Sequence, residues 1–148
     1  MTSYINAALR RLVAIRADYL CEYCLIHEND TFFGCQVDHI ISEKHGGQTE
    51  TDNLAYACAF CNRAKGSDIG SIIPDSGTLI RFFNPRTDLW FEHFTLHEIM
   101  IVPLSPIGEV TVHILNFNDS ERLLERQNLR ALGRYPSAAA LRRMRKYD

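Results

Sequence analysis

The sequence predicts an α+β fold in which a small metal-braced core is followed by an antiparallel β and helical C-terminal extension. Two observations support this class. Apolar residues recur at helical spacing near both ends of the chain, whereas the segments between are short, rich in β-branched and aromatic residues and separated by turn-forming residues. In addition, two Cys-x-x-Cys pairs enclose the first strand-like segments, a pattern typical of small zinc-stabilised units.

Length and composition are those of an ordinary globular protein. The chain has 148 residues, of which 46% are hydrophobic and 23% are charged. No apolar run approaches the roughly 20 residues that a membrane helix needs, so we expect no membrane partner. Because the chain opens with no secretory signal, we expect a cytoplasmic protein. We expect residues 1–70 to form an N-terminal helix and the zinc-braced core, and residues 71–148 to form the extension packed on it.

The first expected element is an amphipathic helix over residues 5–20. Its apolar positions recur at near-helical spacing, at Ile5, Leu9, Leu12, Val13 and Leu20. Arg10 and Arg11 face the other way, and we expect them to be solvated rather than bound to phosphate. The helix would pack on the core and end where the first cysteine pair begins.

The cysteine pairs predict a structural zinc site. Each Cys-x-x-Cys turn presents two thiolates to one point, so the two turns supply four ligands to a tetrahedral Zn²⁺, namely Cys21, Cys24, Cys58 and Cys61. The 33 residues between the pairs imply a folded insert. Since no secretory signal opens the chain, we expect reduced thiols that bind metal, with disulfide bonds or a thiol redox site as the alternatives. The remaining cysteine, Cys35, is expected to be a small buried strand residue.

Between the cysteine pairs we expect two strands and a helix. Residues 32–42 are rich in Phe, Val and Ile and predict a strand, residues 45–48 predict a turn, and residues 54–57 predict a second strand. A short helix is expected over residues 61–67.

The insert also contains polar residues in a characteristic order. They occur in Val37-Asp38-His39-Ile40-Ile41, Gly46-Gly47, Asn53-Leu54 and Cys58-Ala59-Phe60-Cys61-Asn62-Arg63-Ala64-Lys65. With these motifs, about residues 20–67 resemble the HNH endonuclease family, in its variant braced by four cysteines. The resemblance implies a ββα-metal core, which is a two-stranded hairpin followed by a helix around one divalent cation. It matches His39, Asn53 and Asn62 to the motif positions, and Asp38 to the family's metal-binding aspartate.

The resemblance implies a role for each of these side chains in hydrolysing a DNA phosphodiester. A neutral imidazole, with an ordinary pKa of about 6.5, can take a proton from water, so His39 would be the general base. Oxygen ligands suit Mg²⁺ or Mn²⁺, so Asp38 and the Asn62 amide would hold a catalytic cation. Asn53 would orient the loop or the imidazole.

Two cations on the following helix lie nearest to this expected site. Lys65 and Arg63 are candidate contacts to nucleic acid, and solvated charges beside the zinc-thiolate cluster are the alternative.

Asp38 and His39 pose a geometric question, because neighbours on a regular strand point to opposite faces. Both reach one phosphate only if the pair lies at a strand end or a bulge, or if the substrate lies across the sheet edge. The sequence leaves these placements open.

After the motif we expect a connector and then strands. Gly and Pro residues mark the connector over residues 67–77. Strands, arranged as hairpins or a small antiparallel sheet, are expected over residues 78–83, 89–96, 97–102 and 109–115. Trp90 and Phe94 are expected in the core, while Arg86 and His93 could reach DNA.

Two helices are expected at the C-terminal end. Asn118-Asp119-Ser120 predicts the start of one that ends at Gly133, and Ser137 would cap another. Both are basic, through Arg122, Arg126, Arg130 and Arg134 in the first, and Arg142, Arg143, Arg145 and Lys146 in the second. Phosphate contact and simple solvation are both open for these side chains.

Charge is unevenly distributed along the chain. Residues 1–119 hold 8 basic against 15 acidic side chains, a formal charge of −7, whereas residues 120–148 hold 8 against 3, a charge of +5. The C-terminal part is therefore the expected electrostatic contact for a polyanion.

The sequence thus predicts a metal-dependent HNH endonuclease that acts on DNA, with RNA as an alternative substrate. A non-catalytic zinc-stabilised nucleic-acid-binding module would keep the scaffold but tolerate loss of His39. A thiol redox protein would instead oxidise the cysteine pairs. The sequence indicates neither a cleavage sequence nor an oligomeric state.

Overall fold

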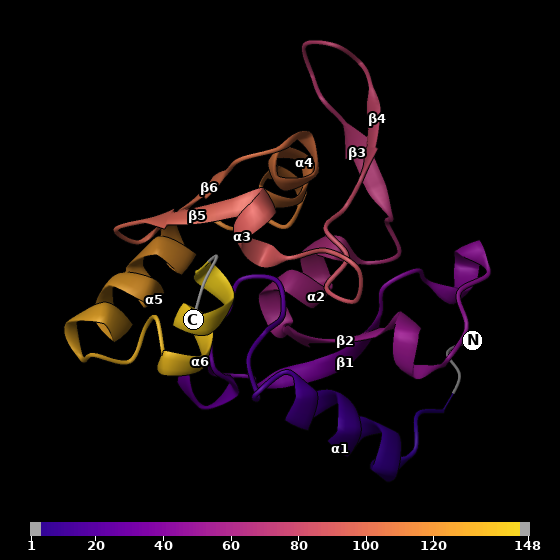
Figure 1. The fold of residues 1–148 in the computed structure, drawn as a ribbon, viewed down its shortest axis with the longest axis horizontal. Helices are drawn as coiled ribbons and strands as arrows, with labels where there is room; N and C mark the ends of the chain where they lie inside the picture. The colour runs from indigo at the N-terminus through magenta and orange to yellow at the C-terminus, as the bar shows by residue number, and fades with distance from the viewer. Residues whose placement is uncertain (1–3, 146–148) are drawn as a thin grey trace.

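The computed structural model describes residues 4–145 and has an α+β architecture (Figure 1). The elements follow in the order α1 (Ala7–Arg16), β1 (Cys35–His39), β2 (Leu54–Cys58), α2 (Ala59–Lys65), β3 (Gly70–Ile72), β4 (Leu79–Arg81), α3 (Trp90–His93), β5 (Phe94–His97), β6 (Met100–Pro103), α4 (Pro106–Ile114), α5 (Ser120–Ala131) and α6 (Ala138–Met144). The strands pair as three antiparallel hairpins, β1–β2, β3–β4 and β5–β6. Among these residues, no helix has the length and apolarity to cross a bilayer.

Helix α1 is shorter than expected from the sequence. Asn6 caps its start, because the Asn6 Oδ1 accepts a hydrogen bond from the Leu9 N–H at 2.8 Å. The helix ends at Arg16 because Asp18 and Tyr19 adopt positive φ angles of 54° and 59°. Val13 lies on the inner face of α1 and packs against β2. Leu12 is 44% exposed, so the prediction that Leu12 belongs to the apolar face is wrong.

The expected hairpin and helix are present at the centre of the N-terminal half. Strands β1 and β2 pair antiparallel with Cys35 opposite Cys58 and His39 opposite Leu54, and α2 follows directly. The connecting loop needs glycine at position 47, where a Cβ would lie 1.7 Å from the Ile41 carbonyl oxygen. A ββα unit therefore forms as the sequence predicts.

One predicted strand is wrong. Residues 109–115 alternate in polarity, but residues 109–114 lie in helix α4 and Leu115 is its C-cap. Ser105 caps this helix by accepting a hydrogen bond from the Gly108 N–H at 3.0 Å, and Pro106 occupies the first turn. Gly108 lets the helix approach the chain, since a Cβ there would lie 2.1 Å from the His93 carbonyl oxygen. These end signals outweigh a pattern that also fits one helical face.

Two other boundaries in the extension differ from expectation. The connector contains strand β3, which pairs with β4. The predicted strand over residues 89–96 begins as the short helix α3 and becomes extended only at Phe94. The expected burial of Trp90 and Phe94 is confirmed, and both belong to a core cluster that also holds Tyr23 of the N-terminal half.

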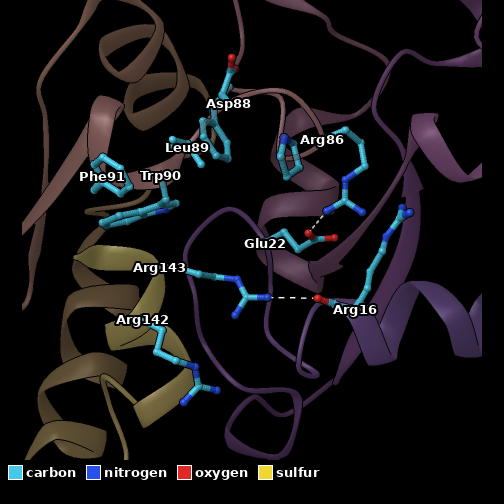
Figure 2. Close-up of a pocket in the computed structure, with 11 residues that line it drawn as sticks. Arg16, Glu22, Arg86, Asp88, Leu89, Trp90, Phe91, Arg142 and Arg143 are labelled. Atoms are coloured by element: carbon cyan, nitrogen blue, oxygen red, sulfur yellow. Dashed lines mark hydrogen bonds and ion pairs between the residues drawn. The ribbon is translucent and has the colours of Figure 1, made fainter. Parts of the chain in front are cut away.

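Polar contacts also join the extension to the N-terminal half. The Trp90 indole N–H donates to the Tyr23 carbonyl at 2.8 Å. Arg86 forms an ion pair with the buried Glu22 (Figure 2). A further contact lies within the extension, where His93 hydrogen-bonds through Nδ1 with the Ser105 hydroxyl at 2.6 Å.

The C-terminal helices begin where the sequence predicts. Asp119 caps α5 and Ser137 caps α6, and Gly133 follows α5 with a φ of 72°. The expectation that Arg122, Arg126, Arg130 and Arg134 contact phosphate or solvent is wrong for two of them. Arg122 and Arg126 are buried, whereas Arg130 and Arg134 are exposed. Lys146, expected in the last helix, lies outside the described residues.

A four-cysteine cluster beside a candidate active-site cleft

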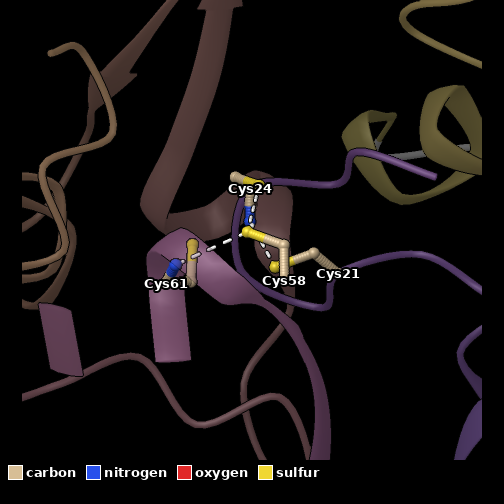
Figure 3. A group of neighbouring side chains, drawn as sticks. All are labelled: Cys21, Cys24, Cys58 and Cys61. Atoms are coloured by element: carbon tan, nitrogen blue, oxygen red, sulfur yellow. Dashed lines mark hydrogen bonds between the residues drawn. The ribbon is translucent and has the colours of Figure 1, made fainter. Parts of the chain in front are cut away.

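The four paired cysteines converge on one point. Two of them lie in the turn after α1, one ends β2 and one lies in the first turn of α2 (Figure 3). The Sγ atoms of Cys21, Cys24, Cys58 and Cys61 all lie within 4.8 Å of one another and are buried. In each turn the second cysteine donates its backbone N–H to the first sulfur, at 3.5 Å for Cys24 and 3.4 Å for Cys61.

This geometry fits a structural zinc ion. A Zn–S distance of about 2.3 Å in a tetrahedron places sulfur atoms about 3.8 Å apart. The Cys24 and Cys58 sulfurs are 3.7 Å apart, which matches that spacing and is far too long for a disulfide bond. Cys35 is only partly buried and lies outside the cluster, and burial raises the pKa of its thiol.

Arg122 of α5 reaches the cluster from the extension. Its Nη2 lies 3.1 Å from the Cys61 sulfur and 3.8 Å from the Cys58 sulfur, while its Nη1 donates to the Leu115 carbonyl at 2.7 Å. The side chain is 3% exposed, with its guanidinium over the rings of Phe60 and Phe117. Burial opposes the charge, but the neighbouring thiolates raise the pKa of Arg122.

Neighbouring groups and burial shift the pKa values of the thiols. Hydrogen bonds from the other three thiols, helped by Arg122, hold the pKa of Cys24 well below its usual range. Burial raises the pKa of Cys21. The sequence did not indicate a buried cation against the cluster, because Arg122 was expected to contact phosphate or solvent.

The candidate cleft runs along β1 from Gln36 to His39, beside α2, and has a volume of about 470 Å³. Asp38 and His39 line it from the end of β1, and Asn62 lines it from α2. Because β1 ends at His39, the two neighbours lie at a strand end, one of the placements that the sequence leaves open. Asn53 does not line this cleft.

His39 is held by a hydrogen bond through one ring nitrogen. The ring is 8% exposed, and its Nε2 lies 2.8 Å from the Thr49 hydroxyl oxygen. The Thr49 hydroxyl donates to Glu43 Oε1 at 3.5 Å. A hydroxyl that donates to Glu43 accepts from Nε2–H, and His39 Nδ1 then carries the lone pair, without a hydrogen bond to any residue from 4 to 145.

Asp38 faces a buried lysine. Its Oδ2 lies 2.9 Å from the Lys65 Nζ, which also donates to the His39 carbonyl at 2.9 Å. Burial raises the pKa of Asp38, and Lys65 opposes that shift. Lys65 Nζ is the one partner that this buried carboxylate oxygen has within residues 4–145.

The two cations of α2 differ in burial, and only Lys65 departs from both expected positions. Lys65 is 1% exposed, so it is neither a surface phosphate contact nor a solvated charge. Arg63 is exposed but lines a neighbouring hollow with Phe60 and Arg122 rather than the cleft. Lys44, which the sequence reading did not single out, is exposed on the rim of the cleft.

The two asparagines occupy different surroundings. Asn53 accepts from the Ile41 N–H and donates to the carbonyls of Ile41 and Gln48, all at 2.9 Å, and so closes the loop between the strands. Asn62 donates through Nδ2 to Gln36 Oε1 at 2.8 Å, which leaves its carbonyl oxygen as an available ligand. The carboxylate of Asp38 and this amide oxygen are hard donors that suit Mg²⁺ or Mn²⁺.

Comparison with known proteins agrees with this local arrangement. Residues 21–68 match the family model described as HNH endonuclease, which confirms the resemblance seen over about residues 20–67. No curated protein and no solved structure gave a match.

Proposed function

From the HNH endonuclease domain at residues 21–68, we propose that the protein is a metal-dependent nuclease that hydrolyses DNA phosphodiester bonds. The observation that carries the proposal is the cleft, in which Asp38, His39 and Asn62 share one cavity beside the four-cysteine cluster. Neither a zinc-stabilised binding module nor a thiol redox protein requires this combination.

In this mechanism His39 acts as the general base through Nδ1. Thr49 holds Nε2, so the ring presents its other nitrogen to a water molecule. As the water oxygen attacks phosphorus, its proton passes to Nδ1, and the bond between phosphorus and the leaving 3′ oxygen breaks. The leaving oxygen takes a proton from solvent, which balances the reaction.

The oxygen ligands in the cleft suit a divalent cation. When bound, Mg²⁺ or Mn²⁺ would supply polarisation of the phosphate and neutralisation of the leaving oxygen. Asp38 and the Asn62 carbonyl oxygen would hold it, while the buried Lys65 positions the Asp38 carboxylate through their ion pair. Asn53 would act indirectly by keeping the loop closed, and the exposed Lys44 takes the phosphate-contact role first assigned to Lys65.

The test is cleavage of supercoiled plasmid with Mg²⁺ or Mn²⁺, comparing the wild type with His39→Ala. Both proteins must have matched zinc content and matched melting temperatures, since His39 is largely buried. We expect nicking or linearisation by the wild type, stopped by EDTA, and a loss of at least about 100-fold in the variant.

Equal cleavage by the two proteins would show that His39 is not the base. If neither cleaves DNA or RNA but both bind nucleic acid, the non-catalytic binding module replaces the nuclease.

A further inference from the structure

A second cavity, of about 440 Å³, lies between the end of α1, the segment before α3 and helix α6 (Figure 2). It shares no lining residue with the candidate cleft. Basic side chains from three separate parts of the chain line it, namely Arg16, Arg86, Arg142 and Arg143. Nothing in the proposed hydrolysis uses them.

A single buried carboxylate faces most of this positive charge. Glu22 accepts from the Tyr56 N–H at 2.9 Å through Oε1 and pairs with Arg86 through Oε2. Burial raises the pKa of Glu22, while Arg86, Arg16 and Arg143 all oppose that shift through their charge. One carboxylate therefore serves three guanidinium groups.

The remaining carboxylates do not balance the pocket. Asp88, the other acidic lining residue, is bound to Arg81, which lies outside the lining. Asp18 pairs with Arg143 at 2.8 Å. The four arginines and two carboxylates of the lining leave two positive charges in excess. Adding the outside partners Arg81 and Asp18, which carry opposite charges, does not change this excess.

Within the described residues neither Arg16 nor Arg142 forms an ion pair, although Glu22 and Asp52 act on Arg16 through their charge. Arg16 donates through Nη2 to the Thr51 and Leu54 carbonyls, both at 2.6 Å, and its buried Nε has no acceptor. Burial, followed by the charge of Arg86, lowers the pKa of Arg16. Arg142 is exposed and has no hydrogen bond or ion pair within the described part of the chain. An anion in the pocket would offset both charges.

We propose that this pocket binds the phosphate group of a nucleotide unit. Guanidinium groups match phosphate oxygens in charge and geometry. The neighbouring wall is apolar, formed by Leu89, Trp90 and Phe91, which suits the attached sugar or base better than a bare ion. The nucleotide unit belongs either to a nucleic-acid strand or to a free nucleotide, and the strand alternative rests on the proposed function.

The first arm of the test measures binding of a fluorescein-labelled 20-base-pair DNA duplex by anisotropy, across a salt series and without added Mg²⁺ or Mn²⁺. Arg142→Glu places a negative charge in the pocket, and Arg130→Glu makes the same change at an exposed arginine of α5 outside it. Leu89→Glu and Leu124→Glu form a second matched pair of exposed leucines.

If the pocket holds a strand phosphate, Arg142→Glu weakens duplex binding about tenfold and lowers the slope of log affinity against log salt by roughly one phosphate contact. Leu89→Glu weakens duplex binding as well, and each pocket variant loses more affinity than its control does. All four proteins should retain wild-type zinc content and melting temperature, so a binding loss would not reflect unfolding.

The second arm titrates thymidine monophosphate into the same proteins by calorimetry. Binding of the mononucleotide that Arg142→Glu abolishes assigns the pocket to a free nucleotide, whereas effects confined to the duplex assign it to a strand. The proposal is wrong if neither probe binds the wild type, or if the pocket variants bind both probes as their controls do. Because cleavage is not measured, this result is separate from the plasmid assay.

Discussion

At the scale of single residues, buried polar contacts decide how the candidate cleft is built. Lys65 binds both the Asp38 carboxylate and the His39 carbonyl from a position with almost no solvent contact. Thr49 binds the one ring nitrogen of His39 that has a partner within residues 4–145. Each contact can be removed by one substitution of similar size.

Replacing Lys65 with Met should destabilise the protein by about 3 kcal/mol near pH 7, because it leaves a buried carboxylate unpaired. Burial already raises the pKa of Asp38, and loss of Lys65 removes the charge that opposes this shift. Protonation of Asp38 relieves the penalty, so the destabilisation should shrink as the pH falls toward the raised pKa and grow as the pH rises. Urea unfolding at several pH values measures it.

Asp38→Asn combined with Lys65→Met provides the control for that prediction. The double variant has no carboxylate to ionise, so its destabilisation should change little with pH. A Lys65→Met penalty that stays constant from pH 4 to pH 8 would contradict the ion-pair account.

Replacing Thr49 with Val should lower the rate of DNA cleavage about fivefold, because the hydrogen bond that orients the His39 ring contributes roughly 1 kcal/mol. Thr49→Ser keeps the hydroxyl and should restore most of the rate. The pH–rate profile should shift in Thr49→Val but not in Thr49→Ser, and a rate loss shared equally by both variants would indicate a packing defect instead.

At the scale of elements, helix α5 supplies the cation that compensates the four-cysteine cluster. Arg122 contacts the sulfurs of Cys58 and Cys61, although more than sixty positions in the sequence separate it from them. A zinc tetrathiolate carries a net negative charge, and a buried guanidinium offsets it where water cannot. The four-cysteine cluster and helix α5 are therefore coupled through this contact.

Arg122→Met should weaken zinc binding by about 10- to 100-fold, as is typical when an outer partner of a metal ligand is lost. Competition with a chromogenic chelator measures the affinity directly. Arg130→Met, at an exposed position of the same helix, is the matched control. Equal zinc affinity in the two variants would mean that Arg122 only fills space.

At the scale of the whole molecule, the cysteine cluster and the extension share one hydrophobic core. The cluster residues, Tyr23, Trp90 and Phe94 all belong to the same group of buried side chains. Trp90 is the only tryptophan of the chain, and its indole N–H binds the carbonyl of Tyr23, between the first two cysteines. Its fluorescence therefore reports on the zinc-braced turn.

Removing zinc with a strong chelator should unfold both halves in one transition. The Trp90 emission should shift to the red at the same chelator concentration at which the far-ultraviolet circular dichroism is lost. Free zinc at 1,000 times its dissociation constant should add about 4 kcal/mol of stability. A partial loss of circular dichroism with unchanged Trp90 emission would show that the extension folds without the metal.

The sequence by itself determined the features that depend on short spacing. Two Cys-x-x-Cys turns bring their sulfurs together through local hydrogen bonds, so Cys21, Cys24, Cys58 and Cys61 could be paired without a structure. The ββα order, the caps at Asp119 and Ser137 and the family resemblance are equally local. The catalytic roles of Asp38, His39, Asn53 and Asn62 stay predictions.

Only the tertiary structure decided which charged side chains lie inside. Lys65, Arg122 and Arg126 read as surface charges because sequence position does not show which helix face is covered. The same limit misassigned residues 109–115, whose apolar positions fit a strand face or a helix face until Ser105 and the close approach at Gly108 select the helix. Burial depends on partners that are remote in the chain, and those partners exist only once the core has formed.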